Sequence, residues 1–407
     1  MNIKTFKIVK IKLLFFLICT VTSLSLFAEP VINAKSAILI DNLTGTVLFE
    51  KNSQESIPPA SMTKLMTLYI AYKNIEEGRL SKDEFVRIDK DADFRSLPPH
   101  SSLMFLEEGQ DVSIIDLMRG LAISSGNDAA IAIATRIAGS VESFVDIMNR
   151  EASELGLESV HFDDASGLSS ANSTNAADFA LFCSVYISRF PTAIVELHSL
   201  RSFSYPKEEN WLSKGSSVHG TIVQYNHSKL IKWYAPVDGL KTGYIDESGY
   251  NVALTAEMNG RRLLAVLLGG PGETNSQGSL IRAIDGINLL SYGFYNFRNI
   301  KSEVSEIKSP KIWKGLQSSV ELQHSKIPVL TLTTEKSVNI KIKVNIIRNI
   351  IAPVKKGDIL GEIVQYTGEE ILGRYSITAA EDIKKGGIFR RLIDSIKIFF
   401  LKLSGDY

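Results

Sequence analysis

Near the start of the chain, two short apolar runs are separated by polar turn residues. Residues 36–40 and 46–49 are rich in β-branched and other apolar side chains, and an Asn/Gly-containing segment, 42–45, lies between them. This arrangement predicts a β-hairpin. Pro58 and Pro59 then end the extended pattern, and a helix is expected to begin at Ser61.

The middle of the chain has helical periodicity, and strand patterns return after it. Leu65, Leu68, Tyr69 and Tyr72 share one face of the helix that begins at Ser61. Further helices are predicted within residues 112–190, including 127–138 and 141–155. Strands are predicted at 235–244, 250–257 and 261–268, with an Asn-Gly hairpin turn at 259–260, and a helix at 276–297.

This order of elements predicts an α+β fold, in which a sheet assembled from both ends of the domain carries helices as an αβα sandwich. The pattern then changes, because Val338, Ile340, Ile342, Val344 and Ile346 alternate strictly with polar residues. Such alternation is typical of a half-buried strand. We therefore expect a first domain at 29–300 and a small, separate all-β domain at 301–383.

Residues 384–407 are expected to form a terminal amphipathic helix. Its apolar side chains follow helical spacing, while arginines and lysines occupy much of the other side; the apolar residues are Phe389, Leu392, Ile393, Ile396, Phe399, Phe400 and Leu403. A basic helix with an aromatic face is typical of a membrane-surface anchor. Docking of this helix on the β-domain is the alternative.

The first 28 residues have the pattern of a secretory signal peptide. Four lysines precede an apolar run at 13–27, which ends at the small residue Ala28. Retention of this segment as a membrane anchor is the alternative. Cleavage would leave 41 basic and 45 acidic residues, so no global basic character points to nucleic acid. Cys183 would be the only remaining cysteine, which excludes an intramolecular disulfide.

Three short motifs occur in a fixed order, and together they specify a chemistry that none implies alone. They are Ser61-Met62-Thr63-Lys64, Ser125-Gly126-Asn127 and Lys241-Thr242-Gly243. Other Ser-x-x-Lys tetrads begin at Ser204 and Ser305, but only the set opened by Ser61 is followed by a Ser-Gly-Asn and then by the Lys-Thr-Gly. The triple is typical of active-site-serine acyl transferases, which use a lysine in place of a histidine base.

Each motif has an expected role in acyl transfer. Lys64 lies one helical turn from Ser61, and a second cation, Lys241, would favour its deprotonation. We therefore expect Ser61 to be the nucleophile and Lys64 its base. The hydroxyl of Ser125 is placed to relay a proton to the leaving group, and the amide of Asn127 to hold a substrate amide.

The third motif closes a predicted strand whose backbone edge suits an extended peptide. Lys241 and Thr242 are expected to bind a substrate carboxylate, and Gly243 to permit close approach. The backbone N–H groups of Ser61 and Tyr244 are the expected oxyanion donors.

Residues 31–403 resemble the low-molecular-mass penicillin-binding proteins that act as serine-type D-alanyl-D-alanine carboxypeptidases. Beyond the three motifs, segments 36–50, 59–64, 101–106 and 239–251 look like signatures of this family. The resemblance implies a penicilloyl-serine-transferase (β-lactamase-like) catalytic domain, with a β-domain and terminal helix in the family's positions. It also implies a substrate, the D-Ala-D-Ala end of peptidoglycan stem peptides, and β-lactams as covalent inhibitors. The implied location is the periplasm or the outer face of the cytoplasmic membrane.

The chain departs from the family pattern at two positions. Tyr244 stands where members commonly have histidine, and His227 aligns with a position that is commonly arginine. His227 is either a titratable substitute for the expected cation that binds the substrate carboxylate, or an ordinary surface histidine.

Three alternative functions remain open at this point. They are a β-lactamase on the same fold, a D,D-endopeptidase, and a catalytically silent peptidoglycan-binding protein. The remaining histidines have no metal-ligand spacing, and no nucleotide-binding glycine motif occurs. We therefore predict neither a metal nor an organic cofactor.

Overall fold

The computed structural model describes residues 29–212 and 216–405, so the predicted signal peptide lies outside the described residues. The chain divides into two compact units, and the boundary falls between Asn296 and Phe297. From the sequence we placed this boundary at 300/301.

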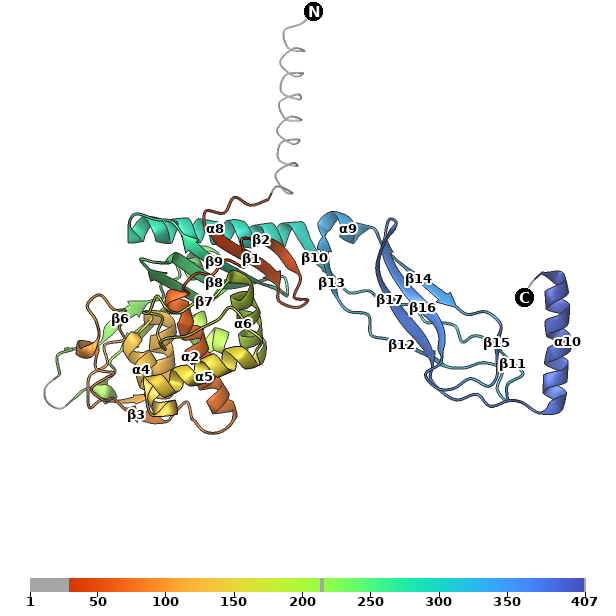
Figure 1. Ribbon diagram of the computed structural model, residues 1–407, viewed down its shortest axis with the longest axis horizontal. Helices are drawn as coiled ribbons and strands as arrows, with labels where there is room; N and C mark the ends of the chain where they lie inside the picture. Colours follow the sequence, from red (N-terminus) through yellow and green to blue (C-terminus); the bar gives the residue numbers. More distant parts are fainter. Residues whose placement is uncertain (1–28, 213–215, 406–407) are drawn as a thin grey trace, which may run out of the picture. The chain divides into compact units, whose positions relative to one another are not determined.

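A five-stranded antiparallel sheet forms the centre of the first unit (Figure 1). Its order is β2-β1-β9-β8-β7, and the strands are β1 (Ser36–Asp41), β2 (Val47–Lys51), β7 (Val237–Ile245), β8 (Gly249–Met258) and β9 (Arg261–Gly270). The N-terminal hairpin therefore pairs with the strands that follow the helical region, through β1 and β9. The strand β7 ends the sheet, and its outer edge pairs with no described strand.

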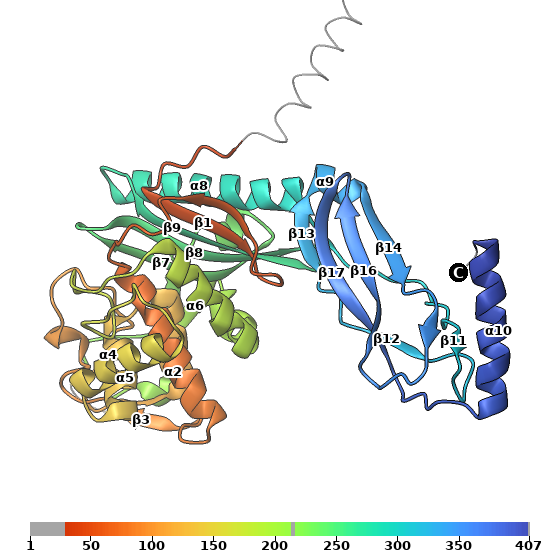
Figure 2. The same cartoon turned by 45° about the vertical axis from the view of Figure 1, so that its right-hand side comes forward.

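Helices cover both faces of this sheet (Figure 2). The helix α8 (Asn275–Asn296) packs on one face, where Gly286 and Gly293 allow close approach because an added Cβ would lie 2.7 Å from Leu254 Cδ1 and 2.6 Å from Leu39 Cδ2. The other face carries α2 (Lys64–Glu76), α3 (Ile114–Arg119), α4 (Asn127–Ala138), α5 (Val141–Glu154) and α6 (Ala176–Arg189). The predicted α+β sandwich is confirmed.

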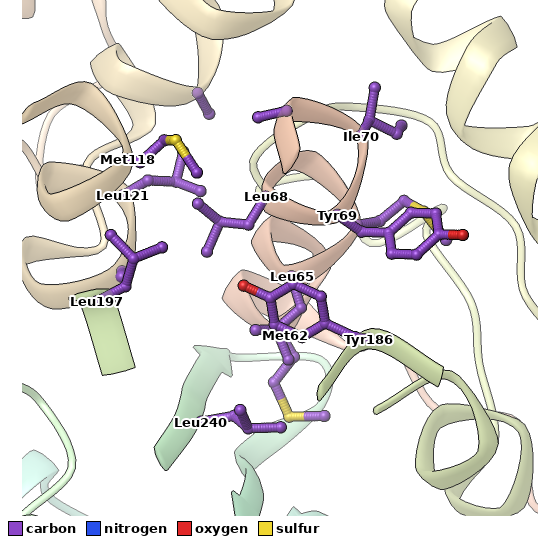
Figure 3. Close-up of a cluster of buried hydrophobic side chains, with 14 of the residues drawn as sticks. Met62, Leu65, Leu68, Tyr69, Ile70, Met118, Leu121, Tyr186, Leu197 and Leu240 are labelled. Atoms are coloured by element: carbon purple, nitrogen blue, oxygen red, sulfur yellow. The ribbon is translucent and has the colours of Figure 1, made fainter. Parts of the chain in front are cut away.

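The central helix α2 is buried on almost all sides, directly after the turn that carries Ser61. Met62 comes from the 3₁₀ turn η1 (Ala60–Thr63), and Leu65 and Leu68 come from α2 itself. Figure 3 shows these side chains packed among residues of other elements, including Tyr186 and Leu240. Because interiors pack as densely as crystals, this surrounding fixes the position of the first turn.

The first unit also contains short elements without a clear periodic pattern in the sequence. They are β3 (Phe85–Arg87), η2 (Phe94–Ser96), β4 (Asp111–Ser113), η3 (Gly120–Ser124), η4 (Ile194–His198), β5 (Ser202–Tyr205), η5 (Glu208–Asn210), β6 (Ile222–Tyr225) and α7 (Leu230–Trp233). The π-helical turn η3 ends at Ser125, which has a left-handed backbone with φ of 58°.

The second unit is built mainly of strands. A four-stranded sheet has the order β12-β17-β16-β14, and two-stranded pairs join β10 to β13 and β11 to β15. The elements are β10 (Phe297–Ile300), β11 (Ile312–Trp313), β12 (Leu322–His324), β13 (Leu330–Thr333), α9 (Thr334–Val338), β14 (Ile340–Ile346), β15 (Ile350–Ile351), β16 (Ile359–Thr367), β17 (Glu370–Ala379) and α10 (Ile388–Ser404). Val338 ends the short helix α9 and is 78% exposed, so its apparent place in the alternating strand pattern was wrong.

The terminal helix α10 leaves most of its apolar side chains exposed. Only Asp394 and Ile398 are buried, and Asp394 accepts a hydrogen bond of 2.7 Å from the backbone N–H of Lys314. Phe389, at 83% exposure, is one of the most accessible apolar side chains of the second unit. Of the helices within residues 29–405, none combines the length and apolar character needed to span a bilayer.

Candidate active site

Ser61 and Lys64 lie in hydrogen-bond contact at the junction of η1 and α2. The Lys64 Nζ atom lies 3.0 Å from Ser61 Oγ. It also lies 2.7 Å from Asn127 Oδ1 and 2.5 Å from the backbone oxygen of Ser166. The amine is therefore held by groups from three separate segments of the chain.

Lys64 is fully buried, and this burial lowers the pKa of its amine to about 7, against the opposing charges of Asp164 and Asp128. Desolvation disfavours the charged form of a lysine. A large fraction of Lys64 is consequently neutral near neutral pH, and a neutral amine can accept a proton from a hydroxyl.

Ser125 and Lys241 form a second serine–lysine pair. The Lys241 Nζ atom donates to Ser125 Oγ at 3.0 Å and to the backbone oxygen of Thr242 at 3.0 Å. Burial, followed by repulsion from Lys64 and Arg282, lowers the pKa of Lys241 well below its usual value. A nearby positive charge disfavours a second one, so Lys64 favours the neutral form of Lys241, whereas the lowered pKa of Lys64 itself comes from burial.

Asn127 and Asp128 begin the helix α4, behind the two serines. Because Asn127 Oδ1 accepts from Lys64, only its NH₂ group remains to hold a substrate amide. The buried carboxylate of Asp128 accepts backbone N–H groups of Met104, Phe105 and Leu106. It thus fixes the preceding loop, a role that the sequence reasoning did not assign.

The end of β7 lies directly against η1. A Cβ added to Gly243 would lie 2.6 Å from the backbone oxygen of Pro59 and 3.2 Å from the backbone nitrogen of Ser61. Any larger residue at this position would push the strand away from the turn that carries Ser61. The N–H of Ser61 consequently lies beside the strand that contains the other expected oxyanion donor, Tyr244.

A cleft of about 410 Å³ joins these groups. Its lining residues include Ser61, Ser125, Thr242, Gly243, Tyr244 and His227, together with His100, Ser102, Tyr250, Asn275, Ser279 and Arg282. The predicted catalytic and binding residues from all three motifs thus lie in or directly behind one cleft. A larger cavity, of about 500 Å³ around Trp233 and Lys232, contains none of them, so the converging side chains mark the candidate site.

His227 lines the cleft but carries no charge near neutral pH. His227 is an exposed residue. Partial loss of water inside the cleft, followed by repulsion from Lys241, Arg282 and Lys64, lowers its pKa to about 4. At this pKa the imidazole of His227 is largely neutral near neutral pH, whereas the arginine that is common at this position in the resembling family would be a fixed cation.

Arg282 is a cation in the cleft that the sequence reasoning missed. It comes from α8, and its Nη1 atom donates to the backbone oxygens of Gly243 and Asn251 at 3.3 and 3.2 Å. Burial lowers the pKa of the guanidinium to about 10, so it remains charged. No carboxylate within residues 29–212 and 216–405 forms an ion pair with it. A half-buried guanidinium that faces a cleft and has no carboxylate partner is suited to bind a substrate carboxylate.

Tyr244 stacks on a neighbouring ring at the mouth of the cleft. Its ring centroid lies 4.4 Å from that of Tyr250, and its hydroxyl donates to Asp246 at 2.7 Å. The side chain is 42% exposed. Tyr244 thus presents an aromatic surface to the cleft, where a histidine would present a titratable ring.

The loop at 163–172 closes the inner side of the site and also escaped the sequence reasoning. Asp164 accepts the backbone N–H groups of Ser166 and Ser169 at 2.8 and 2.7 Å, and that of Gly167. Gly167 has φ of 84°, and its Cβ position would lie 1.9 Å from the backbone oxygen of Ala60. The loop is therefore packed tightly against the turn that carries Ser61.

The described part of the chain contains no cluster of three or more His, Cys, Asp or Glu side chains that could hold a metal ion. The reactive groups are instead two serine hydroxyls and two lysine amines, all in or behind the cleft. Such a set is suited to acyl transfer through a covalent serine intermediate.

Comparison with known families assigns both units. Residues 25–272 match the D-alanyl-D-alanine carboxypeptidase family (peptidase S11), and residues 295–385 match the penicillin-binding protein 5, C-terminal domain family. The D-alanyl-D-alanine carboxypeptidase DacF of Bacillus subtilis is 33% identical over 358 residues, which are 87% of each chain.

Solved structures give the same assignment. Penicillin-binding protein 5 from Haemophilus influenzae matches with a TM-score of 0.72 and 28% identity, over 88% of this chain and 99% of that one. Penicillin-binding protein D2 from Listeria monocytogenes, in a cefotaxime-bound form, matches with a TM-score of 0.55 and 26% identity, over 66% of this chain and 99% of that one.

Proposed function

Because the chain belongs to the D-alanyl-D-alanine carboxypeptidase family and is a serine carboxypeptidase, we propose that Ser61 is its nucleophile and Lys64 its general base. The observation that carries this assignment is the 3.0 Å contact between Lys64 Nζ and Ser61 Oγ, made by a buried amine of lowered pKa. A base near its own pKa at working pH combines the right protonation state with driving force for proton transfer.

Acylation then follows from the arrangement of the cleft. Ser61 Oγ attacks the carbonyl of the penultimate D-Ala while its proton passes to Lys64, and the N–H groups of Ser61 and Tyr244 stabilise the oxyanion. The C–N bond breaks as Ser125, which is hydrogen-bonded to Lys241, delivers a proton to the leaving amine of the terminal D-Ala, and the proton taken up by Lys64 is passed back to Ser125, so that both groups return to their starting state. Water later attacks the ester, which releases the shortened peptide and restores the Ser61 hydroxyl.

Substrate recognition uses both main-chain and charged groups. The free edge of β7 suits addition of an extended peptide. Asn127, which is buried beside Lys64, would donate its NH₂ group to a substrate amide. Thr242 and Arg282 line the cleft and would bind the terminal carboxylate, while Lys241, which was also expected to do so, lies behind Ser125 and Thr242. His227, which is neutral, contributes a hydrogen-bonding wall. The substrate is the D-Ala-D-Ala end of a peptidoglycan stem peptide, and β-lactams would acylate the same serine.

The experiment that tests this function measures free D-Ala after incubation of the protein with a Lys-D-Ala-D-Ala peptide. In parallel, mass spectrometry of a penicillin-treated digest locates the adduct. We expect D-Ala release, and an adduct on the peptide that contains Ser61. Binding without D-Ala release would favour a silent peptidoglycan-binding protein. Rapid penicillin turnover would favour a β-lactamase, and release from cross-linked peptides alone would favour an endopeptidase.

Arg282→Gln is expected to lower kcat/KM for a D-Ala-D-Ala peptide by about 10–100-fold, since it removes a charged hydrogen bond to the carboxylate. The same peptide with a C-terminal amide serves as the second substrate. The wild type should prefer the acid, whereas the variant should distinguish the two poorly. Arg87→Gln, which changes an exposed arginine outside the cleft, should keep the wild-type preference. A preference retained by Arg282→Gln would contradict the assignment.

We also propose that the mature enzyme is exported and held at the outer face of the cytoplasmic membrane by α10. The exposed apolar residues of α10 support this, because few of them pack on the rest of the second unit. Arg390, Arg391, Lys397 and Lys402 supply the basic face expected to contact anionic headgroups.

Truncation after Lys385 should move the protein from the membrane to the soluble fraction. The full-length variant Phe389→Ser/Phe399→Ser/Phe400→Ser should lose binding to vesicles of anionic lipid in the same way, because it removes buried apolar area. Phe85→Ser, which alters a phenylalanine that is 58% exposed in the first unit, is the matched control. D-Ala release from small peptides should persist throughout. Unchanged membrane association would point to the N-terminal segment instead.

A further inference from the structure

The neutral form of Lys64 must present a lone pair, and not an N–H, to the Ser61 hydroxyl. A neutral amine has two N–H donors and one lone pair, whereas its three neighbours here are Ser61 Oγ, Asn127 Oδ1 and the backbone oxygen of Ser166. The Ser166 carbonyl only accepts, and at 2.5 Å it makes the shortest of the three contacts. When both carbonyl oxygens bind an N–H, the lone pair is left facing Ser61.

The position of the Ser166 carbonyl depends on one carboxylate. Asp164 accepts three backbone N–H groups of its turn, those of Ser166, Gly167 and Ser169. The turn is further joined to α2 by a 2.7 Å hydrogen bond from Thr67 Oγ1 to the backbone oxygen of Ala165. We propose that Asp164 is a positioning residue for acylation, which fixes the Ser166 carbonyl and thereby aims the Lys64 lone pair at Ser61.

Asp164 also acts on Lys64 through its charge. The charged or titratable groups that face Lys64 are Asp164 from this loop, Asp128 from α4, Lys241 from β7, and His227 at the cleft. The two carboxylates favour the protonated amine and so oppose the effect of burial on its pKa. Removal of one negative charge therefore lowers the pKa of Lys64 further. A change in the pKa of Lys64 is expected if Asp164 acts through its charge, but not if Asp164 only stabilises the fold.

The test compares Asp164→Asn with Asp164→Ala across a pH series of kcat/KM and of penicillin acylation rate. The asparagine keeps an acceptor but no charge, so the acidic inflection should move to lower pH by about one unit. The alanine frees the turn, so the plateau rate should also fall by about 10–100-fold, because the reacting groups are misplaced. Asp163→Asn, which makes the same charge change at an exposed neighbour, should leave inflection and plateau unchanged.

An Asp164→Asn profile that coincides with that of Asp163→Asn would overturn the proposal, and so would an unchanged plateau in Asp164→Ala. A variant with less folded protein but an unmoved inflection would make Asp164 only structural, which also overturns it. The inference rests on Ser61 and Lys64 as proposed. Wild-type penicillin labelling separates the two failures, since its absence would refute the nucleophile, whereas intact labelling with no shift would refute only the role of Asp164.

Discussion

Ser61→Ala should abolish D-Ala release and labelling by a fluorescent penicillin, with a loss of kcat on the order of 10⁴–10⁶-fold. The substitution removes the only atom proposed to form the acyl bond, while it leaves the cleft and Arg282 in place. Peptide affinity should therefore persist, because the edge of β7 and the carboxylate-binding groups remain. D-Ala release measures turnover, gel labelling measures acylation by penicillin, and equilibrium binding measures peptide affinity.

The chain supplies its own control for this substitution. Ser204 begins another Ser-x-x-Lys sequence, which ends at Lys207. In the structure Ser204 lies exposed on β5, and Lys207 pairs with Asp116 at 2.5 Å. Ser204→Ala should therefore keep full labelling and turnover. Labelling that survives in Ser61→Ala would show that another residue is acylated.

Lys64→Met should reduce acylation by about 10³–10⁴-fold, since it removes general-base assistance and leaves a side chain of similar length. Ser61 and Lys64 act as one unit, so the double variant Ser61→Ala/Lys64→Met should be no slower than the slower single variant. Stopped-flow measurement of penicillin acylation gives both rates. Lys82→Met, at a half-buried lysine paired with Glu196, should leave the rate within about twofold. If the fold-loss of the acylation rate in the double variant equalled the product of the two single losses, Ser61 and Lys64 would not act in the same step.

The wild-type pH profile follows from the same amine. Because the base must be neutral and burial lowers the pKa of Lys64 to about 7, kcat/KM should rise as pH increases through about 7 and then level off. At an unshifted lysine the rise would occur near pH 10.4. A peptide D-Ala release assay between pH 5 and 9 measures this inflection.

Much of the first unit could be predicted because its long elements have strong periodic signals. The strands 235–244, 250–257 and 261–268 correspond to β7, β8 and β9, and the helix at 127–138 to α4. The short strands β3 and β5 were missed, since three or four residues carry too little alternation to detect. Val338 was misassigned because an apolar residue in phase with a strand can also end a short helix.

The candidate site likewise contains residues that the sequence predicted and residues that it did not. The motifs alone identified Ser61, Ser125 and Lys241 as candidates, because the proposed roles belong to their side chains. The contribution of Ser166 is a backbone carbonyl, which leaves no signal in the sequence. Arg282 did leave a signal in the sequence. Its spacing from Asn275 and Ser279, by seven and three residues, places the three polar side chains in a stripe on α8. Only the fold could show that this stripe faces the cleft.

The open edge of β7 has a consequence for how drug tolerance could arise. This edge would bind a peptide through backbone N–H and C=O groups, which every amino acid except proline provides. A point mutation in β7 therefore rarely removes these hydrogen bonds. Substitutions at Gly243 are also excluded, because any side chain at this position would clash with the backbone oxygen of Pro59. Reduced acylation by β-lactams would then have to come from side chains that line the cleft, such as Arg282 or Tyr244, which are also proposed to contact the natural peptide. Each such substitution would then also lower the rate at which the enzyme removes D-Ala from peptidoglycan peptides.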